Sequence, residues 1–270
     1  MNNNYRLYKG FWVYAGQPHD ETALDDSQFK SVLSGGGIGV RNSYNFDKHE
    51  IGNFWYVICD SFIPIENVPS PKVRNQIRKS LKTFNITLID RDYLKSNGYR
   101  VLCAASTRYG NYKLQDEQDF INQIDSLSED CDIWGCIRKE NGQLDAYAIN
   151  YRFSECVDYS SMKADLDSTK GMYPFYGLIH LMNEYYLSQH KYKYVYDGAR
   201  SITEHSNIQP FLIDKFGFRC AYADLKIQYR FPIGIAVKAM FPFRKIIPIK
   251  RLQALLKMEE MTRNKKKAIK

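Results

Sequence analysis

The sequence has no long apolar run and no stretch that resembles a signal peptide. Nowhere in its 270 residues does an apolar segment approach the roughly 18 residues that a membrane-spanning helix needs. Its first eight residues are polar and rich in tyrosine, unlike the apolar core of a secretory signal. Hydrophobic residues make up 44% of the chain and charged residues 25%, as in ordinary globular proteins. We therefore expect a folded cytoplasmic protein.

The chain also lacks the residue groupings of several catalytic and metal-binding classes. Its six cysteines form no CxxC pair and its five histidines form no HxxxH motif, so we expect free, largely buried thiols and no metal site. No G-x-S-x-G motif supports a serine hydrolase. The glycine-rich stretch 35–39 lacks the following Lys-Ser/Thr of a phosphate-binding loop and is expected to be a plain loop.

Positive charge is concentrated at the C-terminal end. Residues 231–270 hold 11 basic and 2 acidic residues, a balance of +9, whereas the first 230 hold 27 and 28. Within this tail, residues 249–261 can form an amphipathic helix, and Lys265-Lys266-Lys267 follow. Such a segment suits an anionic membrane surface. A helix packed on the body with a disordered end is the structural alternative, and nonspecific nucleic-acid binding is a third possibility.

Short aromatic runs predict strands in the first seventy residues, at 11–14 and 54–58. Ser70 and Pro71 then predict the start of a helix, whose apolar stripe ends near Phe84. Arg74, Arg78 and Lys82 lie along one exposed side of this helix, either as a solvated face or as a row that binds phosphate or diphosphate. Strands are expected at 86–89 and 99–105.

The middle of the chain predicts a helix followed by an antiparallel meander. Asp116 is expected to cap a helix that reaches about Leu127. Strands at 133–139 and 144–152 flank the turn 140–143, where Asn-Gly favours a hairpin, and a third strand follows at 156–166.

The last third predicts helix, strand, helix and strands. Pro174 begins a helix, 192–196 is a short strand that ends at Asp197-Gly198, and Ser206 with Gln209 predicts a capping box. Gly217 is expected to end that second helix, and 218–229 to form a final pair of strands.

The order of elements across 116–230 resembles the acyltransferase fold of the GNAT superfamily. Tyr196-Asp197-Gly198, residues 207–211 and Lys215-Phe216-Gly217-Phe218 look like its closing strand–helix–strand segment. Residues 74–82 resemble the corresponding helix of the FemAB-like branch, which transfers aminoacyl groups from tRNA onto amines of cell-wall precursors. The resemblance covers about 160 residues and implies an α/β fold with a central mixed sheet flanked by helices.

The resemblance also implies where an acyl donor would bind. In this fold two strands splay apart to receive the acyl arm, and the next helix N-terminus binds the donor diphosphate. The corresponding segment here is 170–174, in which Lys170 and Gly171 are candidates together with Arg74 and Arg78 of the earlier helix. The family's usual glycine loop is absent, and Ile213 stands where many family members place a tyrosine that reprotonates the leaving thiolate.

Acylation of an amine needs a positioned donor and a base near neutral pH. Asp197 and His205 are the candidates for that base, although Asp197-Gly198 can equally form a turn. Arg200, Ser201 and Asn207 follow Asp197 and are expected to bind substrate, as is Tyr173, which with Tyr109 and Tyr112 could line an acceptor cleft.

These observations predict three segments and an acyltransferase activity. Residues 1–70 form a strand-rich extension, 71–230 the GNAT-like domain and 231–270 the basic tail. The expected reaction moves an acyl group from acyl-CoA to an amine, such as an amino sugar or a cell-envelope precursor, on the inner face of the membrane. Transfer from aminoacyl-tRNA and a catalytically silent binding module are the alternatives, and no metal is expected.

Overall fold

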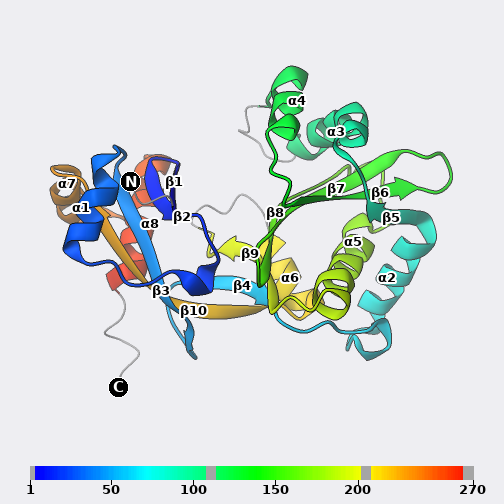
Figure 1. Cartoon of the computed structure of the whole chain (residues 1–270), viewed down its shortest axis with the longest axis horizontal. Helices are drawn as coiled ribbons and strands as arrows, with labels where there is room; N and C mark the ends of the chain where they lie inside the picture. The colour runs from blue at the N-terminus through cyan, green and yellow to red at the C-terminus, as the bar shows by residue number, and fades with distance from the viewer. Residues whose placement is uncertain (1–3, 108–113, 202–207, 264–270) are drawn as a thin grey trace. The chain divides into compact units, whose positions relative to one another are not determined.

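The computed structural model describes residues 4–107, 114–201 and 208–263, and it contains two compact units (Figure 1). The first unit comprises Met1–Val57, Ala199–Glu204 and Cys220–Lys270. The second comprises Ile58–Gly198 and His205–Arg219. Each unit is a mixed sheet with helices packed on it, so the predicted α/β class is confirmed.

The sheet of the first unit joins segments from both ends of the sequence. Its order is β1 (Tyr5–Tyr8), β2 (Phe11–Tyr14), β3 (Gly39–His49) and β10 (Arg219–Tyr229). The pairs β1–β2 and β3–β10 are antiparallel, and β2–β3 is parallel. Residues 218–229 were expected to form two strands, but β10 is a single strand whose pairing with β3 shifts register between Tyr222 and Asp224.

Helices α1 (Asp26–Ser34), α7 (Ile233–Met240) and α8 (Lys250–Arg263) accompany this sheet. The Asp25 carboxylate accepts hydrogen bonds from the backbone N–H groups of Ser27 and Gln28 and so caps α1. Helix α8 confirms the predicted tail helix, but its apolar residues Leu256, Met258 and Met261 are buried. Met261 packs with Phe54, Ala223 and Leu225, so this face of α8 belongs to the core of the first unit.

The sheet of the second unit holds the antiparallel meander predicted from the sequence. Its order is β9 (Tyr194–Ala199), β8 (Cys156–Ala164), β7 (Leu144–Arg152), β6 (Cys131–Arg138) and β5 (Phe84–Leu88). The β5–β6, β6–β7 and β7–β8 pairs are antiparallel, whereas β8 and β9 are parallel. Strand β4 (Trp55–Cys59) carries the chain from the first unit into the second.

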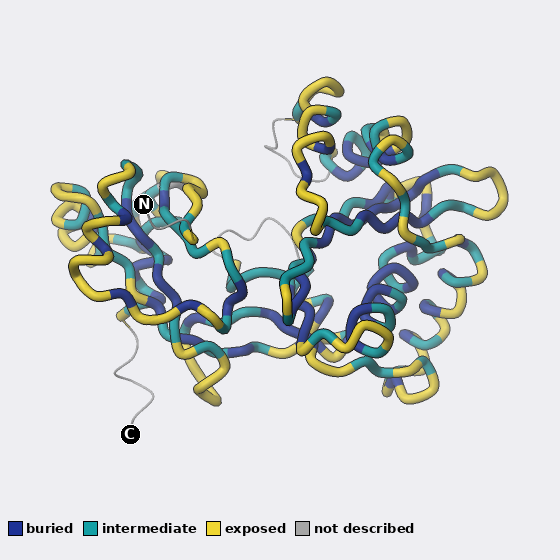
Figure 2. Tube along the Cα trace, in the orientation of Figure 1, coloured by how far each residue is buried: buried dark blue, intermediate teal, exposed yellow. Residues whose placement is uncertain are grey.

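Helices cover both faces of this second sheet, with α3 and α4 on one side and α2 and α5 on the other (Figure 1). Alternating side chains explain the two layers. Ile133, Tyr147 and Ile149 pack with α3 and α4, whereas Trp134 and Asn150 contact Tyr186, which follows α5. Figure 2 shows the resulting buried band along β6, β7 and β8. These helices are α2 (Pro71–Thr83), α3 (Arg91–Ser106), α4 (Glu117–Asp125) and α5 (Pro174–Asn183), which continues as a π-helical turn, Glu184–Gln189.

Helix α3 corrects the strand expected at 99–105. Asp90 accepts a hydrogen bond from the Tyr93 backbone N–H at 2.7 Å and starts a helix that extends to Ser106. Leu94, Val101 and Leu102 are buried on one side of that helix. The apolar run near its end therefore packs at helical spacing, and no strand forms there.

The helix caps predicted elsewhere are confirmed where the structure describes them. Ser70 caps α2 and Asp116 caps α4. Gly217, with φ of +71°, follows α6 (Ile208–Phe216), a conformation that a side chain would strain. Ser206 of the predicted capping box lies outside the described residues.

The two compact units divide the chain differently from the boundaries expected at residues 70 and 230. The reason is strand pairing between distant segments: β10 pairs with β3, which places 220–270 with the N-terminal strands. A sequence boundary at residue 230 would cut between β10 and the helices that pack in the same unit.

Candidate functional site

The parallel pair β8–β9 separates after three residues. Pairing joins Cys156 to Tyr194, Val157 to Val195 and Asp158 to Tyr196. Strand β8 then continues to Ala164 and β9 to Ala199 without a further pair between them. On its other edge β8 stays paired with β7 as far as Ala164. The backbone groups of β8 beyond Asp158 that point away from β7 therefore have no strand partner among the residues that the structure describes, and can pair with an extended ligand.

Asp197 is the first residue of β9 beyond this pairing, and Asp158 is the last paired residue of β8. Burial, and secondly the charge of Asp158, raise the pKa of the Asp197 carboxyl to about 7, against the opposing effect of a hydrogen bond from Gln209. Gln209, on α6, also donates from Nε2 to the Asp197 carbonyl oxygen at 2.9 Å. A carboxyl with this pKa is divided between its two protonation states near neutral pH, as a general base requires.

Asp158 is a functional candidate that the sequence reasoning missed. It is an acidic residue inside the otherwise apolar run Cys156-Val157-Asp158-Tyr159, three of whose residues are buried. An acid at that position of a strand was the available signal, because carboxylates in partly buried surroundings mark candidate sites.

The loop between β8 and α5 contains Lys170, Gly171 and Tyr173. Gly171 has φ of +77°, and a Cβ there would meet nothing within 4 Å, so the space around this residue is open. Tyr173 precedes α5 with φ of 61° and makes no side-chain cap. The Lys79 Nζ of α2 lies 5.8 Å from the centroid of the Tyr173 ring, a cation–π contact.

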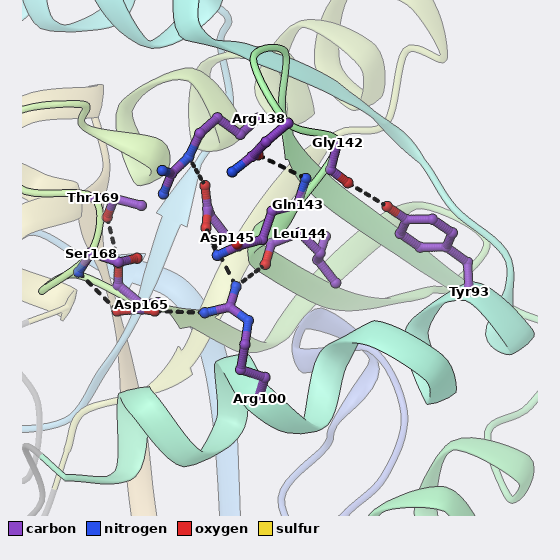
Figure 3. Close-up of polar contacts among 11 residues, drawn as sticks. Tyr93, Arg100, Arg138, Gly142, Gln143, Leu144, Asp145, Asp165, Ser168 and Thr169 are labelled. Atoms are coloured by element: carbon purple, nitrogen blue, oxygen red, sulfur yellow. Dashed lines mark hydrogen bonds and ion pairs between the residues drawn. The ribbon is translucent and has the colours of Figure 1, made fainter.

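Two arginines and two aspartates anchor this loop to the sheet (Figure 3). Arg100 donates from Nη1 to Asp165 at 2.7 Å and also lies 3.4 Å from the fully buried Asp145. Arg138 donates from Nε to the other Asp145 oxygen at 2.7 Å. Although burial opposes it, hydrogen bonds from Ser168 and Arg100 lower the pKa of Asp165, which stays charged and holds the first turn of the loop.

A surface pocket of about 630 Å³ lies between α2 and the β6–β7 hairpin. We call it the basic pocket; its lining residues are Arg78, Lys79, Lys82, Thr83, Arg138, Lys139 and Glu140. Arg78 was predicted to bind the donor phosphates and lines this pocket. Arg74, predicted with it, instead donates from Nη1 to the carbonyl oxygens of Val68 and Pro69, at 2.6 and 3.3 Å.

The remaining predicted site residues lie in the first unit or outside the described part of the chain. Arg200 and Ser201 belong to the first unit. There Arg200 donates to the Asn53 carbonyl oxygen at 2.6 Å and stacks 4.3 Å from the centroid of the Trp55 ring. Four predicted residues lie outside the described part of the chain: Tyr109, Tyr112, His205 and Asn207. The roles assigned to all these residues stay predictions.

Thiols and histidines offer no rival centre in the described ranges. The cysteines are all free, and burial raises the pKa values of Cys59 and Cys131 to about 11, which disfavours a reactive thiolate. Burial lowers the pKa of His180, packed against Phe62, to about 4. Residues 4–107, 114–201 and 208–263 contain no cluster of three or more potential metal ligands. No helix in those ranges has the length and apolarity to cross a bilayer.

With this geometry established, the fold can be compared with known structures. FemX superposes with a TM-score of 0.55 at 12% identity, over 78% of this chain and 78% of FemX. The C-terminal domain of a predicted lysylphosphatidylglycerol synthetase from Agrobacterium fabrum gives 0.52 at 9% identity, over 87% and 82% of the two chains.

The chain shares its fold with FemX and with this synthetase domain. The separation of β8 and β9 is the splayed strand pair that this resemblance implied. No family model matches the sequence, and no curated protein does. At these identities the likeness concerns the fold, and the activity has to be argued from the site.

Proposed function

We propose that the protein is an N-acyltransferase that joins an acyl group to an amine acceptor where β8 and β9 separate. The observation that supports this proposal most strongly is the position of Asp197. It is the first residue of β9 beyond the pairing with β8, close enough to Asp158 to feel its charge, and its pKa is raised to about 7. A base of that strength, next to open strand backbone, matches the requirements of amine acylation.

In the proposed reaction the donor arm extends along the unpaired edge of β8, which positions its carbonyl carbon. Asp197 accepts a proton from the acceptor nitrogen as that nitrogen attacks the carbonyl. The new C–N bond forms, and the bond to the leaving sulfur or oxygen breaks. The proton held by Asp197 then passes, directly or through water, to the leaving group, which restores the carboxylate.

The donor is proposed to be acyl-CoA, with aminoacyl-tRNA as the alternative. The chain lacks the glycine loop that usually holds the coenzyme A diphosphate, and Lys170 and Gly171 supply only a cation and an open backbone position there. The name lysylphosphatidylglycerol synthetase, carried by one protein of the same fold, denotes synthesis of an aminoacylated lipid. An amino sugar or a lipid-linked envelope precursor is the proposed acceptor.

A binding module without catalysis is the second candidate. It is favoured by Ile213, which is 40% exposed and has no proton to give where many relatives place a tyrosine. The two candidates differ in what Asp197 does. A binding module needs no base, whereas the transferase loses its proton acceptor when this carboxyl becomes an amide.

The experiment is transfer by wild type and Asp197→Asn, assayed with acetyl-CoA and aminoacyl-tRNA against a panel of amino sugars and polyamines. Loss of the base is expected to lower the rate about 10²–10⁴-fold. Asp214→Asn, which removes an exposed carboxyl from α6, is the control and should retain the rate. Full activity of Asp197→Asn would refute the proposed role. Absence of transfer with both donors would favour the binding module.

We further propose that the first unit attaches the protein to an anionic membrane surface. Because the apolar face of α8 is buried, the contact would come from 231–249, where Phe231, Ile235, Phe243, Ile246 and Ile249 are 55–80% exposed. Lys238, Arg244 and Lys245 lie in the same segment. Exposed apolar side chains with neighbouring cations favour binding to anionic lipid.

Sedimentation with phosphatidylcholine–phosphatidylglycerol vesicles tests this attachment. Phe231→Ser with Ile246→Ser should lower the bound fraction severalfold, because two exposed apolar anchors are lost. Leu88→Ser with Ile213→Ser removes two exposed apolar residues of the second unit and should leave binding unchanged. Equal partition of the two double variants would contradict the assignment to residues 231–249.

A further inference from the structure

The basic pocket concentrates positive charge that nearby carboxylates do not neutralise. Five of its seven lining residues are cationic, and Glu140 is the acidic one. Within the part of the chain that the structure describes, Arg78 and Lys82 make no hydrogen bond or ion pair with another residue. They stand one helical turn apart on α2, a spacing at which like charges destabilise a helix. A bound anion would offset that repulsion.

Arg138 adds a hydrogen-bond donor that lacks an acceptor. Its Nε binds Asp145, but its Nη2 is buried and has no hydrogen-bond partner among the described residues. A buried N–H without a partner costs about 1–3 kcal/mol relative to one that is paired. Since Arg138 lines the basic pocket, a ligand oxygen bound there could accept this hydrogen bond. Lys139, by contrast, already donates to the Leu81 carbonyl oxygen at 2.9 Å.

Two contacts link the basic pocket to the loop between β8 and α5. Lys79 lines the pocket and lies over the Tyr173 ring, directly before α5. On the other side, Arg138 shares Asp145 with Arg100, which in turn holds Asp165 at the start of the loop (Figure 3). The basic pocket is thus linked to both ends of the loop that follows β8, the strand that carries the proposed reaction site.

We infer that the basic pocket binds phosphate groups of the acyl donor. Phosphate oxygens supply negative charge for Arg78, Lys79 and Lys82 and acceptors for the Arg138 N–H. This second anchor would compensate for the missing glycine loop. Coenzyme A and tRNA both carry such phosphates, so the chemistry is common to the two donors. The inference rests on the proposed function for the statement that the phosphorylated ligand is the donor.

Calorimetric binding of inorganic pyrophosphate, coenzyme A and unacylated tRNA to the full chain tests the inference. The variant is Arg78→Ala with Lys82→Ala, both on the solvent side of α2. Lys30→Ala with Lys72→Ala is the control, because it removes the same charge from exposed helix positions outside the pocket. We expect the pocket variant to bind at least one probe with an affinity lowered about tenfold or more, and the control to bind that probe with an affinity lowered less than about twofold.

The pattern among the probes identifies the ligand. If the pocket variant loses affinity for coenzyme A and pyrophosphate but not for tRNA, the pocket is assigned to coenzyme A. If it loses affinity for tRNA alone, the pocket is assigned to RNA phosphates. Identical binding by the pocket variant and the control, or no binding of any probe to wild type, overturns the inference.

The assay separates this inference from the proposed function because it requires no turnover. Asp197→Asn is expected to bind the probe as wild type does while it loses transfer. If Asp197→Asn keeps transfer but the pocket variant loses binding, the pocket stands and the role of Asp197 fails. If the pocket variant binds normally and Asp197→Asn loses transfer, the role of Asp197 stands and the pocket inference fails.

Discussion

Two pairs of aspartates in the second unit have opposite surroundings. Asp145 and Asp165 each face an arginine, at 2.7 Å from Arg138 and Arg100 respectively, and the pKa of Asp165 is lowered. Asp158 and Asp197 lie on neighbouring strands where β8 and β9 part, and burial, with the charge of Asp158 second, raises the pKa of Asp197. The negative charges of the first pair are balanced by arginines, as expected for residues that hold the loop to the sheet. The second leaves one carboxyl poised to exchange a proton, which is the property expected of a reaction site.

The compensated pair predicts the largest loss of stability. Arg100→Ala removes one of the cations beside the fully buried Asp145 and the one that holds Asp165. Since Arg138 and Gln143 still bind Asp145, we expect the free energy of unfolding to fall by about 2 kcal/mol. Urea denaturation measures it. Arg91→Ala, which removes from the same helix a half-buried arginine that donates to the Ser128 carbonyl oxygen, should cost much less, and equal losses would show that the cluster is not an anchor.

The raised pKa of Asp197 predicts a gain in stability from a substitution that removes activity. A folded-state pKa raised above the unfolded value of 3.8 means that the native state retains a proton which the unfolded state has lost. Stability should therefore decline as pH rises from about 4 to about 7. Asp197→Asn has no carboxyl to ionise at this position. Its free energy of unfolding should therefore exceed that of wild type by about 1–3 kcal/mol at pH 8, with little difference at pH 4.

Thermal unfolding of wild type and Asp197→Asn across that pH range measures the difference. Asp214→Asn, with its exposed carboxyl, serves as the control and should show no comparable gain. A constant difference between Asp197→Asn and wild type at every pH would mean that the carboxyl titrates normally in the folded protein.

The smallest expected effect concerns the contribution of Asp158. Burial is the principal cause of the raised Asp197 pKa and the charge of Asp158 is the second, so Asp158→Asn should lower that pKa only in part and leave it above its ordinary value. Carbon-detected NMR titration of labelled aspartates follows this directly. An unchanged Asp197 titration in Asp158→Asn would show that the two carboxyls do not interact.

Local signals allowed much of the second unit to be predicted from the sequence. Ser70 and Asp116 marked helix starts, Asn141-Gly142 marked the β6–β7 turn, and the elements from Pro174 to Gly217 followed in the expected order. Helix α3 was missed because the consecutive apolar residues Val101 and Leu102 satisfy a strand pattern as well as a helical one. Packing against β7 and β8 decides between them, and a short window of sequence does not contain that information.

The site was harder to predict because it depends on contacts between distant segments. Asp197 was predicted as a candidate base from its place at a strand end. Asp158 becomes its neighbour only through the β8–β9 register, 39 positions earlier in the chain. The basic pocket likewise joins α2 to Arg138 on the β6–β7 hairpin. The division into units has the same origin, because β3 and β10 pair across most of the chain.

The pH dependence of acyl transfer tests the central claim most directly. With the donor that supports turnover, kcat/KM for wild type should rise with pH through an apparent pKa near 7, as Asp197 loses its proton. Asp197→Asn should lose that rise together with most of the rate. A profile without this titration, or an identical profile for Asp197→Asn, would contradict the assignment of Asp197 as the base of an acyl transfer.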